Sequence, residues 1–315
     1  MKQFLLKSLF PQENYRVCIE RYMRLHRLDI WNLLKIRRSA VKSDKLFKKK
    51  NCKNYLSVCA IAKDEGEYIK EWLDYHILFG VDKFYLYDNE STDNMAEVLK
   101  PYIDRGIVDY TVFPGQAVQM KAYEDCIQKH KNDTHWIALI DLDEFIVDTE
   151  PGDIKSFLKT IERFPALQLS WMIYGDSGHK KKTKGMVIEK FKSHALPQHE
   201  TYPKLIINPR LFLYFVDCHI AVFVDKYAVN TRLEAADPFS AKMPCAINDK
   251  FRINHYTIKS FDEYMERRTT RPIAFDGVMV PREKVLENYA YWNRNEVKND
   301  PIMDKYIQKL KEKTG

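Results

Sequence analysis

Three carboxylates stand at the end of an apolar run near the middle of the chain. Asp141, Asp143 and Glu144 follow the apolar run 136–140, and the apolar segment 145–147 comes directly after them. Carboxylates this close repel one another unless a cation compensates them or they extend into solvent. Hard Mg²⁺ and Mn²⁺ ions take oxygen ligands, and they usually combine one or two carboxylates with the phosphates of a substrate. The pattern therefore indicates a divalent-metal site, with a solvated acidic turn as the alternative.

The chain around these acids alternates between apolar runs of strand length and helical patterns. Four runs are predicted as strands: 55–62, 83–88, 108–113 and 136–140. Apolar residues at helical spacing follow the first of them, and Gly80 is placed to end that helix. Strands that alternate with helices are typical of an α/β fold with a mostly parallel central sheet flanked by helices. Shorter apolar runs between 205 and 224 predict strands of mixed orientation that extend the sheet in the C-terminal half.

Ligands of open α/β sheets bind beyond the carboxyl ends of the strands. The residues expected there, besides the acids after residue 140, are Lys63, Glu65, Asp88, Asn89 and Gln119. The chain has no Gly-x-Gly-x-x-Gly fingerprint and no Gly-Lys-Ser or Gly-Lys-Thr loop, which argues against a Rossmann dehydrogenase and a P-loop nucleotide hydrolase. The sequence therefore predicts a nucleotide held by side chains, with a metal bridging its phosphates to the protein.

The positive charge of the chain is confined to its N-terminal segment. Residues 1–53 hold fifteen Lys and Arg against four Asp and Glu, whereas the remainder holds thirty-six against forty. The net charge of +7 is therefore no sign of a nucleic-acid partner. Apolar and basic residues alternate in a helical pattern, which fits either a helix on an anionic membrane surface or a helix packed on the main domain.

The length of 315 residues and a hydrophobic content of 45% suit one large domain with additions. We expect an N-terminal segment with a linker at 1–53, the main domain at 54–270 and a helical extension at 271–315. No stretch is long and apolar enough for a membrane span, and the first residues lack a secretory signal. These features predict a cytoplasmic protein, at most peripheral on the inner face of the membrane. The six cysteines form no Cys-x-x-Cys pair, so neither a zinc site nor a disulfide framework is expected.

An ordered set of motifs resembles the nucleotide-sugar glycosyltransferases of the GT-A fold, in particular families 2 and 92. It comprises the run KDEGEYIKEWLDYHILFGVDKFYLYDNESTDN from Lys63, Gln119-x-x-Ala122-Tyr123-x-x-Cys126, Asp141-x-Asp143-Glu144-Phe145, Trp171-x-x-Tyr174-Gly175-x-Ser177-Gly178-His179, YPKLIINP around Lys204, His219, and NHYTIKSFDEYMERR from Asn254. The set covers roughly residues 55–270. Each motif is weak alone, and their order makes the resemblance specific.

The resemblance implies roles for individual residues in binding a donor. Residues expected to contact a uridine diphosphate sugar are Ala62, Lys63, Glu65, Asp88, Asn89, Gln119, Asp141 and Lys204. Asp143 would bind Mn²⁺ or Mg²⁺ directly, Asp141 would face the ribose or bind the metal through water, and Glu144 would anchor the loop. His255 would complete the metal site, with His219 as the second choice. Lys204, Arg252 and Lys259 are candidate cations for the departing diphosphate.

Glycosyl transfer to a hydroxyl also requires an acceptor site and, for an inverting reaction, a carboxylate that takes the proton of the acceptor. Asp176 is the first candidate base and Glu200 the second. The strand expected at 167–174 and the loop after it provide candidate acceptor contacts, namely Trp171, Tyr174, Ser177, Gly178 and His179. Each could instead be a core or solvated residue.

The expected function is metal-dependent transfer of a hexose from a nucleotide-sugar donor, most simply a UDP-hexose, to a glycan or lipid-linked glycan. An inverting enzyme of bacterial surface polysaccharide or lipopolysaccharide synthesis would fit. The alternative is a nucleotidyltransferase or pyrophosphorylase acting on sugar phosphates, although those enzymes carry a Gly-rich, basic loop where this chain has Lys63-Asp64-Glu65-Gly66. A non-enzymatic docking module using the basic N-terminus is a further alternative, which leaves the acidic strand end unexplained.

Overall fold

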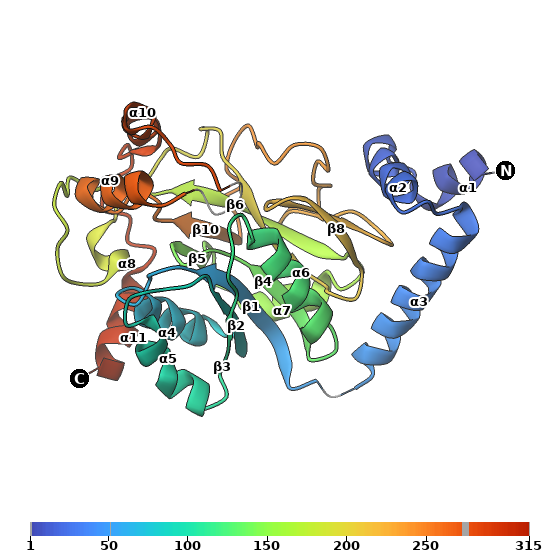
Figure 1. Cartoon of the computed structure of the whole chain (residues 1–315), viewed down its shortest axis with the longest axis horizontal. Helices are drawn as coiled ribbons and strands as arrows, with labels where there is room; N and C mark the ends of the chain where they lie inside the picture. Colours follow the sequence, from blue (N-terminus) through green and yellow to red (C-terminus); the bar gives the residue numbers. More distant parts are fainter. Residues whose placement is uncertain (1, 51, 273–276, 315) are drawn as a thin grey trace.

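An eight-stranded sheet forms the centre of the computed structural model, which describes residues 2–50, 52–272 and 277–314. The strand order is β3-β2-β1-β4-β7-β6-β10-β5, and helices cover both faces (Figure 1). The strands are β1 (Asn54–Ala62), β2 (Lys83–Asp88), β3 (Val108–Val112), β4 (Thr134–Leu139), β5 (Glu144–Asp148), β6 (Ala166–Ile173), β7 (Pro203–Ile207) and β10 (Phe251–His255). The predicted α/β fold is confirmed, because β1 to β4 pair in parallel and the antiparallel pairs all involve β7 or β5.

Helices follow β1, β2, β3 and β5, as the alternation of strand and helix patterns in the sequence indicates. They are α4 (Ile69–Phe79), α5 (Met95–Asp104), α6 (Gln119–His130) and α7 (Ile154–Thr160), and α11 (Asp304–Thr314) packs beside α4. Gly80 ends α4 with a φ of 108°, a left-handed conformation that glycine adopts without steric cost. Two buried side chains of α4 bond to β5: the Trp72 indole donates to the Glu144 carbonyl at 2.8 Å, and the Tyr75 hydroxyl to the Ile146 carbonyl at 2.7 Å. These bonds fix the strand that follows the acids.

Strand β10 was not predicted, and it determines where the C-terminal half meets the acids. It pairs in parallel with β6 and antiparallel with β5, in a register that sets His255 opposite Glu144. Arg252 and Asn254 made the segment look too polar for a central strand. Both are buried, and the Arg252 guanidinium donates to the Asn254 side chain at 2.8 Å and to Asp300 at 2.8 Å. A satisfied polar network of this kind can replace apolar side chains inside a sheet.

Only one of the short strands expected between 205 and 224 extends the sheet. β7 joins it between β4 and β6, whereas β8 (Phe212–Asp217) and β9 (Ile220–Phe223) form a separate hairpin. Alternate residues of this hairpin face two different cores. Phe215 and Phe223 pack with the cluster on α6, and Tyr214 and Val222 pack with the N-terminal helices. Burial on both faces holds the hairpin away from the sheet edge.

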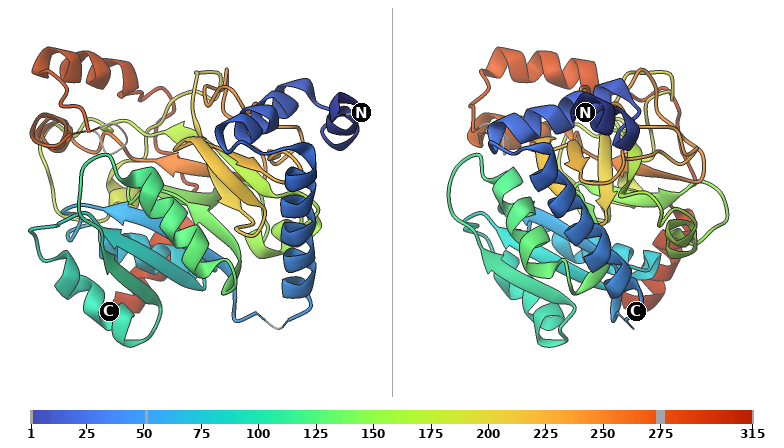
Figure 2. Two further views of the ribbon diagram at one scale, coloured as in Figure 1. Left: turned by 45° about the vertical axis from the view of Figure 1, so that its right-hand side comes forward. Right: turned by 90° about the vertical axis from the view of Figure 1, so that its right-hand side faces the viewer.

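The N-terminal segment packs on that hairpin through three helices, α1 (Lys2–Leu9), α2 (Glu13–Leu25) and α3 (Ile30–Lys48). They lie on the side of the molecule opposite α9 (Phe261–Thr270) and α10 (Arg282–Trp292) (Figures 1 and 2). The Tyr15 hydroxyl donates to the Phe223 carbonyl at 2.5 Å, and buried Asp44 accepts a hydrogen bond from Arg210 at 2.9 Å. The apolar face is therefore largely used in packing on the domain. Phe47 is buried within α3, so helix and not linker extends to Lys48 in the segment 1–53.

The C-terminal part contains α9 (Phe261–Thr270) and α10 (Arg282–Trp292), which lie side by side over one end of the sheet (Figure 2). The predicted extension 271–315 includes 273–276 and 315, which lie outside the described residues, and its boundary stays a prediction. Among the described residues, no helix combines the length and hydropathy that a bilayer span requires.

Candidate active site

A cavity of about 640 Å³ lies beyond the carboxyl ends of β1, β2 and β4. Its size falls in the usual range for small-molecule and cofactor sites, roughly 300–1,000 Å³. Ten of the residues singled out from the sequence line it: Ala62, Lys63, Glu65, Asn89, Gln119, Asp141, Asp143, Trp171, His219 and His255. The expectation that parallel strand ends would gather these side chains agrees with the structure.

One side of the cavity is formed by the loops after β1 and β2. The Asn89 amide N–H donates to the Ala62 carbonyl at 2.8 Å, which ties the two loops together. Asp88 does not line the cavity, so its expected contact with the donor is not supported. Its carboxylate accepts the backbone N–H of Ser91 at 2.9 Å and the hydroxyl of Tyr110, and it therefore shapes the turn that presents Asn89.

The first acid of the pair, Asp141, is held by neutral and cationic donors. Its Oδ1 accepts hydrogen bonds from Gln119 Nε2 at 2.9 Å and from the Tyr123 hydroxyl at 3.2 Å. Its Oδ2 accepts a bond from Lys204 Nζ at 2.8 Å. Both oxygens are therefore engaged by the protein, which leaves Asp141 better placed to orient the floor of the cavity than to bind a metal directly.

Lys204 lies beneath the acids and not in the cavity. It is 1% exposed, and Nζ lies 3.6 Å from Glu144 Oε1 in addition to its bond with Asp141. Burial alone would lower the pKa of Lys204, but the two carboxylates raise it well above its usual value. Glu144 Oε2 accepts the backbone N–H of Asp141 at 3.1 Å, and burial raises the pKa of Glu144. Lys204 thus compensates the acids, and its predicted contact with a diphosphate is not supported.

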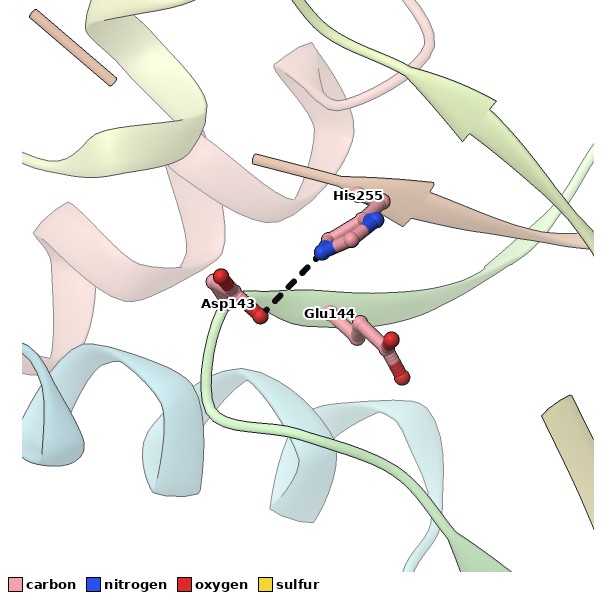
Figure 3. Close-up of side chains that lie close together, drawn as sticks. All are labelled: Asp143, Glu144 and His255. Carbon is pink, nitrogen blue, oxygen red and sulfur yellow. Dashed lines mark ion pairs between the residues drawn. The ribbon is translucent and has the colours of Figure 1, made fainter. Parts of the chain in front are cut away.

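The second acid, Asp143, faces His255 and an arginine. Asp143 Oδ1 lies 3.4 Å from His255 Nε2, and Oδ2 accepts a bond from Arg267 Nη1 at 2.8 Å. Figure 3 shows Asp143 and His255 directed at each other, with the Glu144 carboxylate turned away from them. Burial would raise the pKa of Asp143, yet His255 and Arg267 hold it well below its usual value. Asp143 is therefore ionised and available as a ligand.

This pair meets the geometric demands of a metal site. An octahedral ion with ligands at about 2.1 Å holds neighbouring ligand atoms roughly 3 Å apart, close to the 3.4 Å between Asp143 Oδ1 and His255 Nε2. One ligand atom each from Asp143, Glu144 and His255 lie within 4.8 Å of one another. One usual feature of a metal site is not supplied by the described residues. A ligating histidine usually donates its second N–H to a neighbouring group, and His255 Nδ1 has no hydrogen-bond partner among them. Asp143 and His255 fit as two ligands, with the others left to substrate and water.

Three arginines of the C-terminal part line the cavity and were missed by the sequence reasoning: Arg267, Arg268 and Arg271. Their spacing was a signal that they act together, because residues i, i+1 and i+4 at the end of a helix lie on one side of it. Two predicted cations lie elsewhere. Arg252 pairs with Asp300, and Lys259 Nζ lies 3.4 Å above the Tyr68 ring.

Neither predicted base reaches this cavity. Asp176 is 2% exposed and accepts bonds from the Gly178 N–H at 2.9 Å and the Tyr289 hydroxyl at 2.5 Å. Burial would raise the pKa of Asp176, but these bonds hold it below its usual value, which weakens it as a base. Glu200 pairs with Lys242 and lines a separate cavity of about 30 Å³. Asp176 is therefore held by bonds within its own loop and to α10, and Glu200 forms a partly exposed ion pair.

The predicted acceptor residues separate in the structure. Trp171 lines the cavity, and its ring centroid lies 4.1 Å from that of His255 and 5.0 Å from that of His219. The Tyr174 hydroxyl donates to Asp300 at 2.8 Å beneath the sheet. The rest of the run turns away from the cavity: Ser177 Oγ accepts the Ser193 N–H, Gly178 bonds to Asp176, and His179 packs on Phe191. The position of Tyr174, Ser177, Gly178 and His179 does not support their predicted acceptor role, whereas Trp171 stays a candidate.

Asp217 is a cavity residue that the sequence did not single out. It ends β8, and its Oδ1 accepts the backbone N–H groups of His219 at 2.7 Å and Ile220 at 2.8 Å. No cation of the described residues forms an ion pair with it. The hairpin, which was expected to extend the sheet, thus brings to the cavity a carboxylate that has no ion-pair partner among the described residues.

Comparison with known proteins places this cavity in a family. The model of glycosyltransferase family 92 matches residues 53–274. A family 92 protein of Ricinus communis is 30% identical over 91 residues, which are 29% of this chain and 16% of that protein. Galactan β-1,4-galactosyltransferase GALS2 of Arabidopsis thaliana is 29% identical over 114 residues, which are 33% of this chain and 22% of that protein. The matched part thus spans less than a quarter of these relatives.

Among solved structures, S. aureus TarS 1–349 is 14% identical with a TM-score of 0.38, and the similarity covers 75% of this chain and 70% of that one. The α/β fold with an acidic strand end agrees with the GT-A fold that the resemblance implied. The family match covers well over half of the chain and contains every acid, histidine and arginine of the cavity described above. The chain therefore belongs to glycosyltransferase family 92.

Proposed function

We propose that the protein transfers a hexose from a UDP-sugar donor to a glycan acceptor, with the help of Mn²⁺ or Mg²⁺, and with inversion at the anomeric carbon. The observation that carries this proposal is the pairing of Asp143 with His255 at the rim of a cavity that also holds three arginines. A carboxylate and an imidazole that can hold a divalent cation, with arginines in the same cavity, suit a diphosphate that the cation bridges to the protein.

The leaving group is the diphosphate, and its charge grows as the bond to the anomeric carbon breaks. A bound divalent ion would supply neutralising charge there. Arg267, Arg268 and Arg271 line the same cavity and are cationic donors that would stabilise the same charge. Arg267 bonds to Asp143 at 2.8 Å through Nη1 and to the Thr257 carbonyl through Nη2, so it is held against the carboxylate and neutralises it before a donor arrives.

Inversion needs a base for the acceptor hydroxyl, and Asp217 is the carboxylate we assign to that role. The ring of its near neighbour His219 packs on Trp171, so Asp217 lies on the same side of the cavity as Trp171. Two backbone N–H groups orient Oδ1 and leave Oδ2 to accept the proton. Two relatives are named as galactan β-1,4-galactosyltransferases, and a β product from an α-linked nucleotide sugar requires inversion.

The acceptor is proposed to be a polysaccharide or lipid-linked glycan, in line with the galactan named for those relatives. A bacterial surface polysaccharide or lipopolysaccharide remains our expectation from the sequence. We also propose that the N-terminal helices contact an anionic membrane surface. Basic residues prevail there, and Phe4, Leu25 and Trp31 stay 75%, 65% and 54% exposed.

The test is a screen of nucleotide sugars for metal-dependent hydrolysis and for binding by calorimetry. The proposal expects one UDP-hexose to be hydrolysed slowly with Mn²⁺ and hardly at all with a chelator. Release of pyrophosphate from UTP and a sugar phosphate, without hydrolysis of any nucleotide sugar, would instead identify a nucleotidyltransferase.

A further inference from the structure

A second, smaller cavity adjoins the main one, and we call it the side pocket. It has a volume of about 220 Å³ and lies between the ends of β6 and β10 and the helices α9 and α10. Trp171, His255 and Arg268 line both cavities, so they form the partition between them. A ligand in the side pocket would therefore sit directly beyond the residue that faces Asp143.

The lining of the side pocket combines aromatic and apolar walls with a few polar groups. Trp171, Tyr264 and Trp292 supply the aromatic surface, and Thr257 and Asn288 supply the polar groups besides the partition. Its volume is below the roughly 300 Å³ at which sites for larger ligands begin, which suits a single ring. A pyranose has apolar C–H faces that pack on aromatic rings and a rim of hydroxyls that needs hydrogen-bond partners.

Several hydrogen-bonding groups around the side pocket have no protein partner. Trp171 Nε1, Arg268 Nε and His255 Nδ1 are buried without a hydrogen bond among the described residues. The half-buried Asn288 side chain also lines the pocket and carries an amide. Buried polar groups are usually satisfied, so a cluster of unsatisfied ones beside a cavity indicates a missing polar ligand or water.

The outer wall belongs to α10, which lies beyond the residues matched by the family model. Val285, Asn288 and Trp292 line the pocket at positions i, i+3 and i+7, so one face of this helix is devoted to it. The opposite face carries exposed Leu286. The matched core thus supplies the donor cavity, and this chain's own C-terminal helix closes the pocket beside it.

We propose that the side pocket binds the terminal hexose ring of the acceptor glycan, and that α10 selects this ring. The inference rests on the proposed function and deepens it. The acceptor ring packs between Trp171 and Trp292 and bonds to Asn288 and Arg268, with its reacting hydroxyl directed past His255 toward the donor. The hydroxyl oxygen forms the new bond to the anomeric carbon, the bond to the diphosphate breaks, and the hydroxyl proton passes to Asp217.

The experiment measures binding of the methyl glycosides of galactose, glucose and mannose by saturation-transfer NMR, in the presence of saturating UDP and Mn²⁺. At least one glycoside is expected to bind to the wild-type protein. Asn288→Ala and Trp292→Ala should weaken that binding, the second by about tenfold for the loss of one aromatic wall. Leu286→Ala, on the opposite face of the same helix, is the matched control and should bind like wild type.

The affinity for UDP is measured on the same variants, and it should stay unchanged. If the wild-type protein does not bind UDP, the proposed function itself is refuted. If UDP binds, the inference is overturned by the absence of binding of all three glycosides, or by Asn288→Ala and Trp292→Ala variants that bind a glycoside as well as the control does. An effect of either variant on the KM for the donor alone would place the donor sugar in the pocket and overturn it too.

Discussion

Replacing Lys204 by methionine should destabilise the protein, because Lys204 lies beneath the cavity and is the cation that compensates Asp141 and Glu144. Nζ lies 2.8 Å from Asp141 Oδ2 and 3.6 Å from Glu144 Oε1, and the lysine is 1% exposed. Removing one partner of a buried ion pair costs about 3–5 kcal/mol when the other charge stays buried and unpaired. Asp141 is 32% exposed and keeps its bonds from Gln119 and Tyr123, so the cost arises chiefly at buried Glu144. At about 2–4 °C per kcal/mol, the midpoint of thermal unfolding should fall by roughly 6–20 °C.

The loss should depend on pH, and its sign follows from Glu144. Burial raises the pKa of Glu144 in the folded protein, and without the lysine this carboxyl group has no compensating charge. A carboxyl group whose folded pKa exceeds its unfolded pKa binds more protons when folded, so stability rises as the pH falls through the folded pKa. The deficit of Lys204→Met should therefore be larger at pH 8 than at pH 5.5.

Thermal unfolding followed by circular dichroism at both pH values is the assay. The matched control is Lys70→Met, which removes a lysine from an exposed ion pair with Asp74 and should cost at most about 0.5 kcal/mol. The double variant Lys204→Met/Glu144→Gln should regain part of the loss, because it removes one uncompensated charge. A Lys204→Met midpoint within about 2 °C of wild type at pH 8 would refute the compensating role.

Three further predictions concern the cavity and the N-terminus. Asp217→Asn should lower the rate of transfer by about 10²–10⁴ with UDP affinity unchanged, as steady-state kinetics and calorimetry can check. Gly66→Ala should weaken UDP binding and cost about 1–3 kcal/mol, because its Cβ would lie 2.5 Å from Asn94 Oδ1; UDP titration and thermal unfolding measure both. Trp31→Ser should reduce sedimentation with anionic vesicles but not change UDP binding, and equal sedimentation would contradict a membrane contact.

The sequence predicted well the elements whose signals are local. The apolar run of β2, the helical spacing of α4 and the glycine after it each depend on neighbouring residues, and each element lies where it was expected. The family was also predicted, because its motifs are short and ordered along the chain. The carboxyl ends of parallel strands must share one edge, so the meeting of Asn89 with Asp143 at one cavity followed from topology.

The parts that depended on long-range partners were not predicted. Lys204 was read as a cation for substrate, and nothing in the sequence shows that β7 inserts beside β4 and places it under the acids. Asp176 was chosen as a base from its turn, but its partner Tyr289 lies 113 positions away. Asp217 was overlooked because its role depends on a hairpin held between two cores.

The metal was inferred from charge repulsion among three acids, and the structure changes that argument. Lys204 and Arg267 already supply two of the compensating charges. What now supports a metal is the alignment of Asp143 with His255 through the β5–β10 register, which no local pattern reveals.

The most direct test of the account is therefore a measurement on Asp143. Calorimetric titration of UDP with Mn²⁺ into wild type and Asp143→Asn, with free Mn²⁺ followed by electron paramagnetic resonance, separates metal binding from turnover. The account predicts that the variant stays folded, loses at least about tenfold in metal-dependent UDP affinity and leaves Mn²⁺ free. Equal UDP affinity and equal Mn²⁺ uptake by the two proteins would contradict it.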